Sequence, residues 1–402
     1  MEDPGRDGSK VIINRSLQKI AKGAVFILIS TIIGTFLGFL SRLIIIRGTS
    51  QNIYGLYSLC IMITGLVGSI AFLGMGRGVM RFIAYYRGKK DELKIKSCIF
   101  FSFFLTLFLS FILTFVLFIF SDLISIRIFH DSNLSLPLKI FSFSIPFYVI
   151  ITLVRQIFRG FDRTDAEIFF NKIGRNLIFV LFLIPLFLFP LGIRYVAYAY
   201  LVASFLTVVF LIFFMKKKLL FKPNLFTVDL RLGKRLLLFF LPLMGGMFSS
   251  KIMTWADTFL LGVYKTSDVV GLYYGAVPLA QFIPFFLGAM IFIYTPVVST
   301  LYAKKNHEEI KNIYPVVTKW AFLMGVPILF VFLLFPKKIL IFLFGIEYVD
   351  AWLVLIIVSV GSFIHTLLGA NAQTLTSFGY TKIQFYAMAF AALVNIVLNV
   401  IL

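Results

Sequence analysis

Charged side chains within long apolar stretches are the residues of this sequence best suited to carry chemistry. Lys251 and Arg42 lie in stretches that are otherwise largely apolar, and Asp257 is the carboxylate that shares a stretch with Lys251. Ionisable groups are costly in a hydrocarbon environment, so they commonly mark the path of a substrate or an ion. Two cations and one anion in such places predict an anionic ligand and an internal ion pair.

Lys251 is the strongest candidate. It lies 12 residues before the end of a helix predicted over 236–263, which is about 18 Å at 1.5 Å per residue. A lysine at that depth in a membrane is too far from the surface for its amine to reach water easily. It either faces a central cavity, as a phosphate ligand or a coupling group, or is buried against local carbonyl groups.

Arg42 and Asp257 are expected at matching depths. Arg42 lies about five residues, roughly 8 Å, from the end of a helix predicted over 23–46. Asp257 is comparably close to the outer end of its own helix. An Arg42–Asp257 ion pair would act as a gate that holds the outer ends of the two helices together. The alternatives are an arginine whose head reaches the interface and an aspartate that faces water.

Arginines also lie where predicted helices end on the inner side, at positions 77, 81, 155 and 159. Arg77 and Arg81 could receive a diphosphate at the mouth of a pathway, or could simply hold the helix end on the cytoplasmic side. The three histidines and two cysteines match no metal-ligand spacing. No catalytic group, metal or cofactor is therefore expected.

The elements that position these residues are expected to be membrane-spanning helices. Sixty per cent of the residues are hydrophobic and 14% are charged, against roughly a quarter charged in soluble domains. Apolar runs of about 20 residues recur, enough to cross a bilayer as helix. We therefore expect an all-α polytopic membrane protein. Eleven helices are predicted, at about 23–46, 53–74, 98–120, 138–158, 176–192, 195–214, 236–263, 269–298, 314–335, 351–376 and 383–402.

The positions of lysine and arginine predict the orientation of these helices. With the N-terminus in the cytoplasm, 29 of the 38 basic residues fall on the inner side and seven on the outer side. Basic residues in short loops favour the cytoplasmic side. The net charge of +21 is therefore a topology signal that also attracts anionic lipids, and nucleic acid is not an expected partner.

The sequence also repeats itself about 216 positions apart. "IYGLYSLC" from Ile53 resembles "VVGLYYGA" from Val269, and the register holds over more than 100 positions. The repeating unit holds six helices, an even number, so both copies start on the same side of the membrane. This predicts two lobes related by a pseudo-two-fold axis along the membrane normal.

The repeat sets the expected organisation of the chain. A basic cytoplasmic tail (1–22) precedes an N-terminal lobe (23–214), a cytoplasmic linker (215–235) and a C-terminal lobe (236–402). The sixth helix of the first lobe has no counterpart in the second. The second lobe is therefore expected either to be truncated, which we favour, or to be naturally short.

The stretch from Thr49 to Glu92 resembles the polysaccharide-biosynthesis flippases, whose superfamily also holds the multidrug and toxin extruders. The likeness is carried by Tyr54-Gly55-Leu56-Tyr57, Gly74, Gly76, Arg81-Phe82 and the basic loop that follows. "FGIEYVDAW" and "LTSFGYTK" in the second half are also similar. The resemblance implies a cell-membrane transporter, not an enzyme. It would flip a polyisoprenyl-(di)phosphate-linked oligosaccharide to the outer leaflet by alternating access, with membrane lipids and other polysaccharide-assembly proteins as partners.

In that setting Lys251, Arg42, Arg77 and Arg81 would bind the substrate, and Asp257 with Arg42 would serve in gating or coupling. Two alternatives remain open. A cation-coupled multidrug antiporter of the same fold would need carboxylates in its cavity, and this sequence offers one. A membrane oligosaccharide polymerase would need a larger outer loop than the 17 residues of 121–137.

Overall fold

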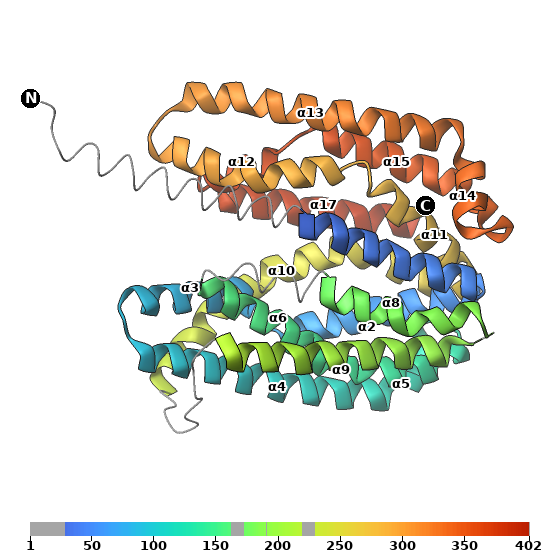
Figure 1. Cartoon of the computed structure of the whole chain (residues 1–402), viewed down its shortest axis with the longest axis horizontal. Coiled ribbons are helices and arrows are strands. Elements are labelled where there is room, and N and C mark those ends of the chain that lie inside the picture. The colour runs from blue at the N-terminus through green and yellow to red at the C-terminus, as the bar shows by residue number, and fades with distance from the viewer. Residues whose placement is uncertain (1–28, 162–172, 190, 219–229, 402) are drawn as a thin grey trace, which may run out of the picture.

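The computed structural model describes residues 29–161, 173–189, 191–218 and 230–401, and every regular element in these ranges is a helix. The helices form two lobes that lie side by side with their long axes roughly parallel (Figure 1). The expected all-α fold with two lobes is confirmed. The expected basic tail (1–22) lies outside the described residues.

The described part of the N-terminal lobe contains eight helices. They are the first helix Ile29–Gly48, α2 Gln51–Ala71, α3 Met75–Gly88, α4 Glu92–Leu123, the bent pair α5 Ser135–Ser142 and α6 Ser144–Gly160, and α8 Arg175–Leu183 with α9 Ile193–Lys218. Short helical turns link them on the side where α8 ends, among them η1 Ile124–Ile128, η2 Ser132–Leu134 and η4 Ile184–Phe187.

The C-terminal lobe continues from a long helix that lies between the lobes. Its helices are α10 Leu230–Tyr264, α11 Ser267–Ala280, α12 Phe285–Ala303, α13 His307–Leu334, α14 Pro336–Phe344, η5 Ile346–Ala351, α15 Trp352–Leu367, α16 Asn371–Ser377 and α17 Thr381–Ile401. The predicted linker 215–235 overlaps the end of α9 and the start of α10, and its middle, 219–229, lies outside the described residues.

Each of the eleven predicted spans coincides with helix, although several are interrupted. Within the described ranges, eight segments are long and apolar enough to cross a membrane, and α5 with α6, bent by 45°, would make a ninth. The span predicted over 269–298 is two helices, because Pro284 cannot donate a backbone hydrogen bond and the chain turns at 281–284. The span predicted at 53–74 ends at Ala71, and Leu73 and Gly74 adopt left-handed conformations (φ +47° and +68°) before α3.

Polar residues just outside the apolar stretches start several helices. The Ser50 side chain accepts a hydrogen bond from the Ile53 backbone at the start of α2, and Asp91 accepts one from Lys94 at the start of α4. The Lys94 ammonium also donates to the Asp91 carboxylate at 2.7 Å, which lowers the pKa of that carboxyl. These caps satisfy backbone N–H groups that the first helical turn leaves without partners.

The two lobes meet most closely where α2 and α11 begin, an end that we call the α2–α11 end. Gly55 and Gly271, 216 positions apart, lie at this crossing with the two backbones in contact. A methyl group added to Gly55 would overlap the carbonyl oxygen of Ser267, and one added to Gly271 would overlap that of Gln51. The repeated glycine is therefore the residue that allows this approach, since any larger side chain would separate the helices.

Hydrogen bonds around the crossing follow the same two-fold relation. The Gln51 amide donates to the backbone oxygen of Glu347, and the Ser267 hydroxyl donates to the Asp131 carboxylate at 2.6 Å. Both partners in the second bond are offset by 216 from those in the first. Asn52 and Asp268, again 216 apart, contact each other at 3.3 Å. Equivalent residues of the two repeats thus face one another across a pseudo-two-fold axis, as the repeat predicts.

The long helix α10 is shared between the lobes. Near its start, Leu232, Leu236 and Phe240 are buried in the apolar core of the N-terminal lobe, and Phe240 fills the space beside Gly78 of α3. Its later part contacts α11 and α17 of the C-terminal lobe. The boundary predicted at residue 235 therefore lies within a helix that contacts both lobes.

Candidate functional site

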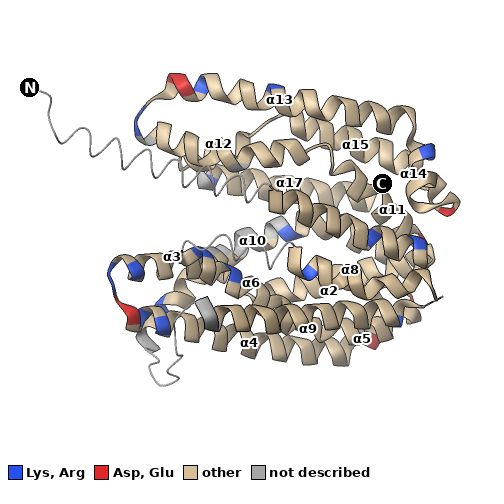
Figure 2. Ribbon diagram, viewed as in Figure 1, with Lys and Arg blue, Asp and Glu red and all other residues tan. Residues whose placement is uncertain are grey.

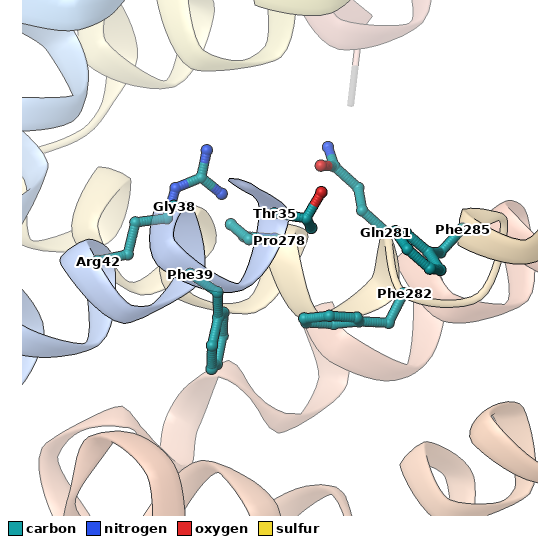
Figure 3. Close-up of a pocket in the computed structure, with 8 residues that line it drawn as sticks. All are labelled: Thr35, Gly38, Phe39, Arg42, Pro278, Gln281, Phe282 and Phe285. Atoms are coloured by element: carbon teal, nitrogen blue, oxygen red, sulfur yellow. The ribbon is translucent and has the colours of Figure 1, made fainter. Parts of the chain in front are cut away.

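A cavity of about 320 Å³ lies between the lobes, and we call it the interlobe pocket. One wall is the first helix and the other is the break between α11 and α12. It is lined by Thr35, Gly38, Phe39, Arg42, Pro278, Gln281, Phe282 and Phe285. Figure 3 shows the polar ends of Arg42, Thr35 and Gln281 extending to one side, with the rings of Phe39 and Phe282 on the other.

The two rings close one side of this pocket. Phe39 and Phe282 meet edge to face, with ring centroids 5.4 Å apart, so an aromatic contact joins the first helix to the C-terminal lobe. Nearer the α2–α11 end, the Arg47 guanidinium donates to the backbone oxygens of Phe342 and Leu343 at the end of α14. The pocket is therefore bounded toward that end by direct contacts between lobes.

A second cavity, the lobe pocket, lies inside the N-terminal lobe and measures about 200 Å³. Its walls are the first helix, α2, α8 and α9. It is lined by Gly38, Ser41, Arg42, Tyr57, Ile61, Arg175, Asn176, Phe179, Tyr200, Ala203 and Ser204. Arg42 and Gly38 line both cavities, so Arg42 stands between a space within one lobe and a space between two lobes.

Small residues of the first helix bring α8 close enough to form the lobe pocket. The Asn176 amide donates to the backbone oxygen of Gly34 at 3.0 Å, and a methyl group on Gly38 would lie 3.3 Å from the same amide nitrogen. Further along, a methyl group on Gly48 would lie 2.9 Å from Leu186. The close packing places Arg175, at the start of α8, on the same cavity as Arg42.

Two guanidinium groups therefore share one small polar cavity. Among the described residues neither Arg42 nor Arg175 has a carboxylate partner. Ion pairs between described residues are formed by Lys94, Lys96 and Lys139, away from this cavity. Two half-buried cations without a carboxylate partner attract an anion, and the planar fork of each guanidinium suits phosphate or carboxylate oxygens. The lobe pocket is thus chemically fitted to a phosphate group.

Arg175 is the functional candidate that sequence reasoning missed. It follows a basic loop and directly precedes the helix predicted over 176–192, so the predicted topology includes it among the 29 basic residues on the inner side. The close packing of α8 against the first helix, which brings Arg175 inward, leaves no periodic pattern in the sequence. One signal was available: Arg175-Asn176 is a polar pair at the very start of an apolar helix that should already lie in the membrane.

Lys251 is half-buried on α10, 13 residues before the helix ends at Tyr264. It is not among the residues that line the two cavities described above. The offset of 216 makes it the counterpart of Thr35, which does line the interlobe pocket. Because α10 is the counterpart of the first helix in the C-terminal lobe, Lys251 is expected at the same depth as the interlobe pocket.

Asp257 does not pair with Arg42, so the expected ion pair across the outer gate is wrong in this conformation. The carboxylate accepts hydrogen bonds from the Tyr273 hydroxyl at 3.1 Å, the Asn395 amide at 3.1 Å and the Asn399 amide at 2.8 Å. The two asparagines lie one turn apart on α17, so both amides reach the same oxygen. All three donors belong to the C-terminal lobe, so the carboxylate is directed into its own lobe.

The arginines at the inner helix ends are dispersed. Arg81 is exposed on α3, and its guanidinium carbon lies 4.9 Å from the centroid of the Phe239 ring on α10. Arg77 is part of α3, and its side chain lies outside the described residues. Arg155 is half-buried and Arg159 exposed at the end of α6. Arg81 lines neither cavity, and a direct substrate contact for Arg77 or Arg81 stays a prediction. In the described ranges no three His, Cys, Asp or Glu residues could jointly hold a metal.

Comparison with known structures supports the fold. A multidrug resistance MATE family transporter of the MOP superfamily in an inward-facing conformation aligns with a TM-score of 0.72 and 18% identity, over 92% of this chain and 88% of that one. The outward-facing conformation of such a transporter aligns with a TM-score of 0.61 and 19% identity, over 93% of this chain and 86% of that one. Identities this low speak for the shared fold alone.

Comparison of sequences goes further. A probable low-salt glycan biosynthesis flippase, Agl15 of Haloferax volcanii, is 28% identical over 161 residues, which cover 39% of this chain and 33% of that protein. The family model for MatE matches residues 242–401. The model for polysaccharide biosynthesis proteins matches residues 20–302, well over half of the chain. The chain therefore belongs to the polysaccharide biosynthesis protein family, within a superfamily of multi-pass membrane transporters.

Proposed function

We propose that this protein flips a polyisoprenyl-(di)phosphate-linked oligosaccharide from the cytoplasmic to the outer leaflet of the cell membrane. The observation that carries this proposal is the pair Arg42 and Arg175, two guanidinium groups without carboxylate partners in the lobe pocket. A phosphate-linked headgroup is the anionic part of such a lipid. The glycan flippase among the relatives supports the sugar-bearing substrate.

The protein would make and break no covalent bond in this reaction. The phosphate would be held by Arg42 and Arg175 while the polyisoprenyl tail stayed in the bilayer beside the first helix. In the present conformation the lobes touch at the α2–α11 end. Release on that side would require Gly55 and Gly271 to separate, and the lobes to rock about the bound headgroup.

The charge distribution supports an orientation with the N-terminus in the cytoplasm. Figure 2 shows basic residues gathered near the α3–α4 turn and few charges of either sign along the middle of the helices. This turn lies at the end opposite to the α2–α11 end in Figure 1. The α2–α11 end would then face outward, and the present conformation would be open toward the cytoplasm.

Cysteine labelling in intact cells tests this orientation. Ser50, exposed at the α2–α11 end, and Glu308, exposed in the first turn of α13, lie on opposite predicted sides. A membrane-impermeant maleimide should label Ser50→Cys in intact cells and Glu308→Cys only after the cells are opened. The two native cysteines are buried free thiols, so their background should be low. The reverse labelling pattern would contradict the proposed direction of flipping.

Neutralising either guanidinium tests the substrate. We expect Arg42→Gln and Arg175→Gln each to weaken binding of a polyisoprenyl-diphosphate-linked oligosaccharide, because a charge-assisted hydrogen bond contributes roughly 1.5–3 kcal/mol, or roughly 10- to 100-fold in affinity. Arg194→Gln is the matched control, since Arg194 is exposed on α9 and lines neither cavity. The readout is lipid binding to the purified full chain in nanodiscs.

A second candidate function is a cation-coupled multidrug antiporter. It is favoured by the MatE match over 242–401 and by the half-buried carboxylate of Asp257 on α10. It makes the opposite forecast in the same set of variants. Asp257→Asn would abolish export of a cationic drug, while Arg42→Gln and Arg175→Gln would leave it intact. Normal lipid binding by both arginine variants, together with drug export lost in Asp257→Asn, would replace the flippase proposal.

A further inference from the structure

We propose that Gln281 and Thr35 form a sugar-binding subsite in the interlobe pocket, beside the phosphate site. This inference rests on the proposed function and assigns the part of the headgroup that each side chain contacts. Arg42 would bind the phosphate from the N-terminal lobe. Gln281 would bind hydroxyl groups of the first sugars from the C-terminal lobe, so that one headgroup touches both lobes.

Depth is the first argument. Gln281 follows Ser267 by 14 residues, about 21 Å of helix, and Thr35 precedes Gly48 by 13 residues, about 20 Å. Both residues are exposed, although these depths place them well inside a bilayer core about 30 Å thick. A primary amide is poorly suited to hydrocarbon, so Gln281 is best explained by a water-filled cavity between the lobes.

The helix break aims the amide into that cavity. At the break, the Phe282 backbone N–H donates to the Leu279 carbonyl oxygen at 3.0 Å, and the Ile283 N–H donates to that of Ala280 at 3.1 Å. Pro284, which follows, has no N–H to donate. The Phe282 ring is fixed against Phe39 of the other lobe. With Phe282 held on one side, its neighbour Gln281 extends to the other, where Figure 3 places the polar ends of Thr35 and Arg42.

The chemistry of these groups suits a sugar better than a second phosphate. The Gln281 amide can donate and accept hydrogen bonds, and the Thr35 hydroxyl can do both as well. Neither carries charge, so neither adds to the attraction for phosphate. A cavity of about 320 Å³ is large enough for one or two sugar rings beside the guanidinium of Arg42. A site that hydrogen-bonds hydroxyl groups discriminates strongly against a ligand that lacks them.

The experiment compares two lipids on the same variants of the full chain in nanodiscs. One probe is a polyisoprenyl-diphosphate-linked oligosaccharide and the other is polyisoprenyl diphosphate without sugar. We expect Gln281→Leu to weaken binding of the sugar-bearing lipid five- to tenfold and to leave binding of the bare lipid unchanged. Thr35→Val should act in the same direction with a smaller effect, and Arg42→Gln should weaken both lipids.

Gln373→Leu on α16 is the matched control, because this half-buried glutamine lines neither cavity. Thermal unfolding of each variant identifies loss of folding, and Thr35→Val carries the test if Gln281→Leu does not fold. Equal weakening of both lipids, or of neither, by the folded Gln281 and Thr35 variants would overturn the sugar subsite. Unchanged binding in Arg42→Gln and Arg175→Gln would instead overturn the proposed function, so the two failures are distinct.

Discussion

Alanine at Gly55 or at Gly271 is expected to reduce transport by at least about 100-fold. The added methyl group would overlap the carbonyl oxygen of Ser267 or Gln51, both of which belong to helix backbone and cannot rotate away. The two helices would have to move apart, which removes the contacts that close the α2–α11 end. A transporter that cannot close one end cannot alternate access, even when its lobes fold and insert normally.

Gly65→Ala is the matched control for this prediction. Gly65 lies on the same helix as Gly55, and an added methyl group there meets no atom within 4 Å. Closure itself is read from a cysteine pair at Asn52 and Asp268, whose side chains contact each other at 3.3 Å in the closed end. The pair should crosslink in the otherwise unchanged protein and in Gly65→Ala, and crosslink poorly in Gly55→Ala. Normal transport and crosslinking in Gly55→Ala would show that the helices tolerate separation.

Replacing Lys251 by methionine is expected to abolish transport. A lysine near the middle of the membrane is costly unless water or an anion stabilises it, and translocon scales put that cost at about 3 kcal/mol. Its equivalence to Thr35 in the repeat places it at the level of the interlobe pocket. If Lys251 faces that space, its ammonium adds a third cation for the headgroup, and arginine should retain part of the activity.

The control is Lys265→Met, which removes an exposed lysine just beyond the end of α10. Initial rates of lipid-linked oligosaccharide flipping in proteoliposomes provide the measurement, with thermal unfolding to confirm the fold. If Lys251 is instead buried against helix carbonyls, methionine will be neutral or stabilising and the rate will not change. That result would remove Lys251 from the site.

Much of the architecture was predictable because helix and repeat leave strong signals in the sequence. Apolar runs of membrane length marked each span, and the offset of 216 predicted two lobes related by a pseudo-two-fold axis. The breaks were harder to predict. The break at 281–284 lies within a continuous apolar run, where hydropathy alone cannot distinguish one long helix from two short ones.

The site was only partly predictable, because pairing is decided by packing between distant helices. Arg42 was identified from its depth, yet Arg175 was assigned to a loop, since no local pattern shows where a chain re-enters the membrane. The predicted partner of Asp257 was wrong for the same reason. Matched depth made Arg42 plausible, whereas the actual donors are Tyr273 and two asparagines that α17 places 138 and 142 positions away.

The shared position of α10 has a mechanical consequence. Because its start is embedded in one lobe and its end contacts the other, the lobes cannot rock as two independent rigid bodies: α10 must flex whenever they do. Between these two contacts the sequence of α10 carries a proline and two glycines, at positions 242, 245 and 246, which are residue types that weaken a helix and favour bending. The helix would then bend to a different extent in each of the two conformations, and the free-energy cost of bending would differ between them. The stiffness of α10, as well as substrate affinity, would therefore determine the rate of transport.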